Sequence, residues 1–98
     1  NDYWATSLGE LIKNTNFKTN NVLKIGTCGF INEALKHYLK KRPDLNFKFV
    51  LPNEADYIIM TNRVSRYYGV MNCFDIFKGS DIATVKRNGL ILSVIRKI

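Results

Sequence analysis

The sequence predicts a three-layer α/β domain, with a central mixed, mainly parallel sheet and a C-terminal β-hairpin at the edge. Three observations lead to this prediction. Helical and strand patterns alternate along the chain. The apolar run from Tyr57 to Met60, with polar residues at its ends, is typical of a strand covered on both faces. Asn88-Gly89 is the preferred pair for a tight type I′ turn between two strands.

The first half of the chain alternates helix, strand and helix. We expect a helix at about residues 7–16, with Ser7 as its N-cap and Glu10 completing a reciprocal capping box. A strand at residues 22–27 follows. The next segment has apolar residues at helical spacing until Pro43 stops the helix.

The second half is richer in strands. A short alternating strand at residues 47–51 precedes the buried strand at residues 56–61. A polar, aromatic segment at residues 62–69 leads to a shorter helix that Gly79 closes. The order α-β-α-β-β-α-β-β places parallel strands joined by helices at the centre of the sheet.

The tail of the chain predicts the hairpin. Arg87 is set opposite Leu90 when Asn88-Gly89 forms the turn. Alternation then places five apolar residues on one face: Ala83, Val85, Leu90, Leu92 and Val94. Isoleucines on the other face indicate that it is partly covered as well.

The length of the chain is that of one domain, residues 1–98, and its net charge indicates a partner. A 46% hydrophobic content is sufficient for a single core. Asn1 is no translation start, so we expect a domain cut from a longer protein. The net charge of +7 favours an anionic partner, although Lys and Arg also keep small domains soluble. No run reaches the roughly 18 apolar residues of a membrane span.

The strand–turn–helix around Cys28 is the first candidate for chemistry. A cysteine at a helix N-terminus could accept a phosphoryl group, as in the cysteine-loop subunits of sugar phosphotransferase systems. A phosphatase would need an arginine six residues later, where Ala34 stands. One histidine and two distant cysteines provide no metal cluster, and no carboxylates are paired. We therefore predict no catalytic residue, metal or cofactor.

The two cysteines also raise the question of a disulfide. Cys28 ends the first predicted strand, and Cys73 follows the buried strand at residues 56–61. If these strands are neighbours, their ends come close enough for a bond in an oxidising compartment. A small buried thiol at the strand end is the alternative.

The best candidate for binding is the loop after the buried strand. In open α/β sheets, ligands bind beyond the carboxyl ends of the strands. Arginine with tyrosine suits sugars and phosphates, because it combines stacking faces with bidentate donors. The predicted ligand-binding residues are Thr27, Asn62, Arg63, Arg66, Tyr67 and Tyr68. Alternatively, the tyrosines cover the core edge and the arginines are solvated.

The opening Asp2-Tyr3-Trp4-Ala5-Thr6-Ser7 and Glu10 resemble a known family. Similar segments follow the last transmembrane helix of bacterial GT-C type glycosyltransferases, which are dolichyl-phosphate-mannose protein mannosyltransferase-like. Later matches are Lys-Arg-Pro-Asp-Leu at 41–45, Ala-Asp-Tyr-Ile-Ile at 55–59 and the Gly-bearing hairpin with its basic end. Ala5 departs from the usual glycine.

The resemblance implies a non-catalytic domain on the periplasmic side of the bacterial inner membrane. Its partner would be the membrane-embedded remainder of the same chain, which uses a polyprenyl-phosphate sugar donor. The domain would assist acceptor or partner binding, with lipid head groups or lipid-linked sugar nearby. Tyr3 and Trp4 would be membrane-proximal, since amphipathic aromatics favour the membrane–water boundary.

Two alternatives stay open. The first is a stand-alone basic α/β domain that binds nucleic acid or a phosphorylated ligand. The sequence contains no helix-turn-helix, zinc-finger or RNA-binding aromatic signature, so nucleic acid is the less favoured partner. The second is a phosphocysteine carrier of the phosphotransferase type that uses Cys28.

Overall fold

A computed structural model describes residues 3–18, 21–66 and 69–98. Within these ranges, helices and strands alternate in the predicted order, with a small additional hairpin, β4–β5. The helical elements are α1 (Tyr3–Asn14), α2 (Asn32–Leu39), a single 3₁₀ turn η1 (Pro52–Glu54) and α3 (Cys73–Ile76). The strands are β1 (Leu23–Cys28), β2 (Phe47–Phe49), β3 (Tyr57–Thr61), β4 (Val64–Ser65), β5 (Met71–Asn72), β6 (Ser80–Arg87) and β7 (Leu90–Lys97).

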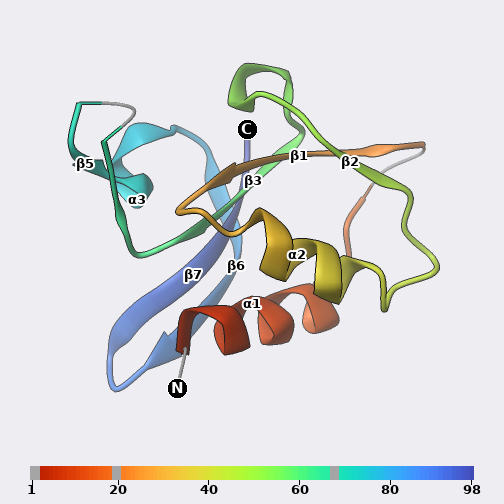
Figure 1. The fold of residues 1–98 in the computed structure, drawn as a ribbon, viewed down its shortest axis with the longest axis horizontal. Helices are drawn as coiled ribbons and strands as arrows, with labels where there is room; N and C mark the ends of the chain where they lie inside the picture. Colours follow the sequence, from red (N-terminus) through yellow and green to blue (C-terminus); the bar gives the residue numbers. More distant parts are fainter. Residues whose placement is uncertain (1–2, 19–20, 67–68) are drawn as a thin grey trace.

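The main sheet has the strand order β2-β1-β3-β7-β6 (Figure 1). β1 pairs in parallel with β2 and with β3. β7 runs antiparallel to both β3 and β6. The sheet is therefore mixed, with the C-terminal hairpin at one edge. This confirms the predicted α/β fold class.

The side chains of the central strands β1, β3 and β7 are divided between two separate cores, one on either face of the main sheet. The larger core lies under α1 and α2, which contact each other (Figure 1), and we call this side the helical face. β3 shows the division clearly. Ile59 packs into the helical-face core, while Ile58 and Met60 pack into the other. The second core lies under the one-turn helix α3, and we call this side the α3 face. The third layer of the fold is therefore thin.

The start of α1 differs from the prediction. The helix begins at Tyr3, and Ser7 lies inside it with 1% of its surface exposed. The N-cap and capping box assigned to Ser7 and Glu10 were therefore wrong. Neither Gly nor Pro interrupts the four residues before Ser7, so the helix extends through them. Glu10 instead forms an ion pair with Arg87 of β6.

The turn of the C-terminal hairpin follows the prediction. Asn88 and Gly89 both have positive φ, 54° and 79°. A type I′ turn requires this of both central residues, and Asn and Gly adopt it most readily. The turn sets Arg87 opposite Leu90.

The facing of the hairpin residues was predicted wrongly, because β7 carries a β-bulge at Leu92. Val85 pairs with Ser93, although regular alternation from the turn would pair it with Leu92. One extra residue reverses which side chains share a face. Val85 therefore packs with Ile95 in the helical-face core, whereas Val94 packs on the α3 face. The five residues predicted to share one face are divided between both.

An arginine holds the end of the main helix on the helical face. Arg42 Nη1 donates to the carbonyl oxygens of Ile12, at 2.9 Å, and Thr15, at 2.5 Å, around the C-terminus of α1. Its Nη2 pairs with Asp44 at 2.7 Å. Carbonyls at a helix C-terminus lack partners within the helix, so this guanidinium satisfies them.

The same arrangement recurs on the α3 face. Arg96 Nη1 donates to the carbonyl oxygens of Phe74, at 2.8 Å, and Phe77, at 2.5 Å, around the end of α3. Its Nε pairs with Asp81 at 2.6 Å. We call these two arrangements the Arg42 clamp and the Arg96 clamp. Among the described residues, none of the helices has the length and apolar content that crossing a bilayer requires.

Candidate binding site at the carboxyl end of the sheet

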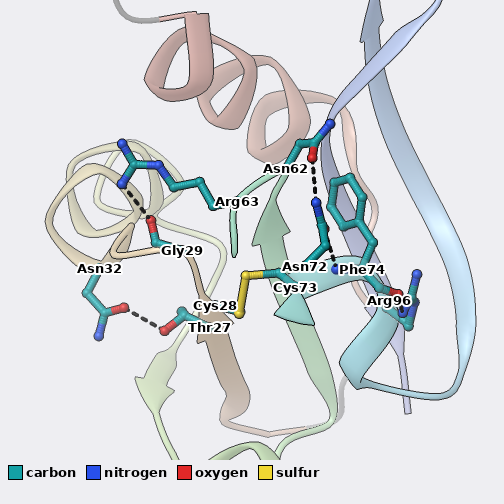
Figure 2. Close-up of a disulfide and its surroundings, with 10 residues drawn as sticks. All are labelled: Thr27, Cys28, Gly29, Asn32, Asn62, Arg63, Asn72, Cys73, Phe74 and Arg96. Atoms are coloured by element: carbon teal, nitrogen blue, oxygen red, sulfur yellow. Dashed lines mark hydrogen bonds between the residues drawn. A yellow bond between two sulfur atoms is a disulfide. The ribbon is translucent and has the colours of Figure 1, made fainter. Parts of the chain in front are cut away.

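A disulfide between Cys28 and Cys73 organises the candidate site (Figure 2). Cys28 is the last residue of β1, and Cys73 is the first residue of α3. The parallel register of β1 and β3 brings their carboxyl ends together, and the two Cα atoms lie 5.8 Å apart. β1 and β3 are neighbouring strands, which is the condition under which the sequence allowed this bond. It fastens the chain segment after β3 to the end of β1.

The disulfide bears on one alternative function. A phosphocysteine carrier needs Cys28 as a free thiolate nucleophile. In this structure the Cys28 sulfur is bonded to Cys73, and the residue is 6% exposed. The phosphocysteine hypothesis is therefore incompatible with the oxidised protein. Among the residues that the structure describes, no group of three or more His, Cys, Asp or Glu is arranged to hold a metal ion.

A groove of about 540 Å³ opens beside the disulfide. Its polar part contains Thr27, whose Oγ1 donates to Asn32 Oδ1 at 2.6 Å (Figure 2). Leu51 and Val64 contribute apolar wall. Hydroxyl, amide and apolar groups together suit a small polar ligand with one apolar side, such as a sugar ring. The lining residues are Thr27, Cys28, Gly29, Phe30, Asn32, Glu33, Val50, Leu51, Pro52, Val64 and Ser65.

The predicted arginines lie at the rim of this end. Arg63 is exposed, and its Nη1 donates to the Gly29 carbonyl at 3.4 Å, which links the β3–β4 connection to the β1–α2 turn (Figure 2). Arg66 is also exposed. Within the described part of the chain, no carboxylate forms an ion pair with either guanidinium. Both therefore retain donors for an anionic ligand.

Asn62 has a supporting position. Its amide nitrogen donates to the Ile91 carbonyl at 3.1 Å, and its Oδ1 accepts from Asn72 Nδ2 at 2.7 Å. Asn72 in turn caps α3, because its Oδ1 accepts the Phe74 N–H at 2.9 Å (Figure 2). These bonds hold the β4–β5 hairpin and α3 to the sheet.

Several predicted residues fall outside the described part of the structure. Tyr67 and Tyr68, predicted to bind ligand, are among them. The side chains of Tyr3 and Trp4, predicted to be membrane-proximal, are also outside it, although α1 begins at Tyr3.

Sequence reasoning missed two exposed apolar residues near this end of the sheet, of which Phe30 lines the groove. Phe30 is 94% exposed and has φ 58°, and Val70 is 68% exposed and has φ 59°. Positive φ is uncommon for residues other than glycine, and it is a true outlier for a β-branched one. Each follows a glycine that also has positive φ, Gly29 or Gly69. In the sequence, the pairs Gly29-Phe30 and Gly69-Val70 were the signal that could have indicated these exposed residues.

Comparison of the chain with protein-family models, with curated proteins and with solved structures finds no significant match. The fold and the geometry of the site therefore carry the functional argument, together with the likeness of the opening residues.

Proposed function

We propose that the chain is a non-catalytic, extracytoplasmic domain of a bacterial membrane glycosyltransferase that uses a polyprenyl-phosphate sugar donor. In this proposal the carboxyl end of the sheet faces the membrane and assists binding of the acceptor or of the lipid-linked sugar. The exposed Arg63 and Arg66 supply cations for phosphate, and the groove beside Thr27 accommodates sugar hydroxyls.

The observation that carries the proposal is the disulfide, together with its location. Structural disulfides persist in oxidising compartments, which supports the periplasmic side over the cytosol. β1 ends at Cys28, and its carboxyl end lies on the same side of the molecule as the start of α1 (Figure 1). A small cavity of about 60 Å³ joins Ala5 of α1 to Phe30 and Arg63. A membrane segment preceding α1 would therefore place the candidate site close to the bilayer.

The first test is the topology of the parent protein. The residues encoded before Asn1 are expected to include an apolar segment of about 20 residues. Alkaline phosphatase, which needs an oxidising compartment, is then fused after Ile98, with green fluorescent protein fused at the same position as the control. High phosphatase activity with little fluorescence is the expected result. The reverse pattern, or a free cytosolic parent, would refute the proposal.

The second test concerns the role of the arginines in sugar transfer. Arg63→Ala/Arg66→Ala in the full-length enzyme is expected to raise KM for the lipid-linked substrate and leave kcat nearly unchanged, because the domain supplies binding rather than chemistry. Lys24→Ala/Lys48→Ala removes the same charge from exposed positions on β1 and β2 and is the matched control. A loss of kcat with constant KM would contradict a binding role.

A further inference from the structure

Four exposed apolar side chains gather around the disulfide-linked end of the sheet. Phe30 projects from the β1–α2 turn, and Val64, Val70 and Met71 belong to the β4–β5 hairpin and its connection. Their exposed fractions are 94%, 56%, 68% and 42%. We call this set the apolar tip. The β1–α2 turn and β5 lie toward the same end of the molecule (Figure 1).

The backbone at the tip is held in a costly conformation. Phe30 and Val70 both have φ near +60°, where side chains other than glycine are strained. Neither side chain is buried, so packing inside this domain does not compensate for that strain. Strain of this kind persists where the surroundings impose it, and it concentrates at functional sites. Here the disulfide fixes both segments, since Cys28 lies two residues before Phe30 and Cys73 three residues after Val70.

Cations accompany the apolar tip. Arg63 precedes Val64, and its guanidinium reaches the Gly29 carbonyl, next to Phe30 (Figure 2). Arg66 follows β4 and is exposed. Long arginine side chains can leave their apolar stems among lipid chains while the charge contacts phosphate. Glu33 is the acidic residue that lines the groove, and it is paired with Lys36 at 3.8 Å.

We propose that the apolar tip inserts into the interfacial region of an anionic bilayer, with Arg63 and Arg66 binding lipid phosphates. A lipid surface fits better than a protein groove because Phe30 is almost completely exposed and projects without neighbouring apolar cover. Acyl chains surround such a side chain from every direction. The proposal goes beyond the glycosyltransferase hypothesis, because it requires neither a sugar nor a membrane-embedded enzyme.

The test measures binding of the oxidised 98-residue chain to vesicles of equimolar phosphatidylcholine and phosphatidylglycerol. Phe30→Asn is the informative variant, because asparagine tolerates positive φ but cannot insert. Its partition coefficient is expected to fall about tenfold, since burying a phenylalanine favours transfer by at least this factor. Ile98→Asn is the matched control. Ile98 is 54% exposed and follows β7 at the opposite end of β3.

The contribution of charge is tested by comparing vesicle binding of Arg63→Ala/Arg66→Ala with that of Lys24→Ala/Lys48→Ala. Each arginine at the lipid surface is expected to contribute about fivefold, so the first pair loses more binding than the second. Thermal unfolding of Phe30→Asn verifies the fold, and its midpoint is expected to equal or exceed that of the wild type because the strain is relieved.

Three outcomes would overturn the proposal. They are no vesicle binding by the wild type, equal binding by wild type and Phe30→Asn, and equal losses in the tip and control variants. A protein partner that protects Phe30 while the vesicles do not would assign the surface to protein docking instead.

Discussion

The two faces of the sheet are closed by the same device but supported by different cores. On each face, an arginine donates to two carbonyls at a helix end and pairs with an aspartate: Arg42 with Asp44, and Arg96 with Asp81. The helical face adds a large apolar cluster beneath two full helices. The α3 face has a smaller cluster beneath a helix of four residues.

This difference shows how a thin layer can be kept in place. A single helical turn cannot be stable alone, because too few hydrogen bonds repay the ordering of the chain. The α3 segment is held instead by the disulfide, the Asn72 cap and the Arg96 clamp. The helical face depends on burial, and the α3 face depends on specific bonds. The candidate site lies at the carboxyl ends of β1 and β3, where the disulfide ties α3 to β1.

The largest expected effect comes from removing the disulfide. Cys28→Ser/Cys73→Ser opens a loop closed over a sequence separation of 45 residues and should cost about 4 kcal/mol of unfolding free energy. Core amides of α1 and β3 should lose protection in hydrogen exchange that corresponds to this global cost, whereas amides of β5 and α3 should in addition exchange through local opening. Local opening of equal extent on both faces would mean that the faces do not differ as argued.

The next effect tests burial on the helical face. Leu35 is fully buried in α2, so Leu35→Ala should cost about 3 kcal/mol. Leu51→Ala, at a position that is 65% exposed, is the control and should change stability by less than about 0.5 kcal/mol. Urea unfolding of both variants, oxidised and reduced, measures the effect. The Leu35 cost should be the same in both redox states, because the sites are independent. If the cost of Leu35→Ala differed between the oxidised and the reduced protein, the two faces would be energetically coupled.

Comparing the two clamps gives a smaller effect. Arg96→Ala should cost about 2 kcal/mol, because it leaves two carbonyls at the end of α3 without a donor. Arg42→Ala should cost about 1 kcal/mol, since buried apolar residues also hold α1. Equilibrium unfolding in urea measures both. Arg96→Lys should not restore stability, because one ammonium cannot replace a planar guanidinium fork. A larger cost at Arg42 than at Arg96 would reverse the comparison.

The sequence predicts the features of this fold that local chemistry determines. Asn88-Gly89 sets its turn and the register of the adjacent pair, because few other residues accept positive φ at both positions. The mostly apolar β3, whose five residues are all buried, is central because it must be covered on both faces. The bulge at Leu92 was missed because it depends on the pairing of β7 with β6. The position of Ser7 inside α1 was missed because a capping-box pattern does not show whether the residues before it already continue the helix.

The candidate site was only partly predictable for the same reason. Thr27 and the disulfide follow from the neighbouring ends of β1 and β3. The hydrogen bonds that Asn62 makes, to Ile91 and to Asn72, come from chain segments that sequence periodicity does not bring together. The exposure of Phe30 depends on a strained turn, and the one local signal for it in the sequence is the pair Gly29-Phe30.

The smallest expected effect concerns the aspartates of the two clamps, Asp44 and Asp81. The hydrogen bond from Arg42 holds the pKa of Asp44 below its ordinary value. A lowered folded-state pKa adds stability above the ordinary aspartate value of about 3.9, and that stability is lost as pH falls through the folded value. Asp44→Asn should therefore flatten the acid limb of a plot of unfolding midpoint against pH. The change should be slight, because the Asp44 side chain is 60% exposed and solvent screens the pair.

A double-variant cycle tests that cause. In Arg42→Ala, adding Asp44→Asn should leave the acid limb unchanged, because the donor that lowers the Asp44 pKa is gone. A persistent change would assign the lowered pKa to another group. At neutral pH, Asp44→Asn should also cost less stability than Asp81→Asn, whose side chain is 39% exposed and whose arginine holds the thinner layer. The reverse order would show that α3 relies on its disulfide and not on its clamp.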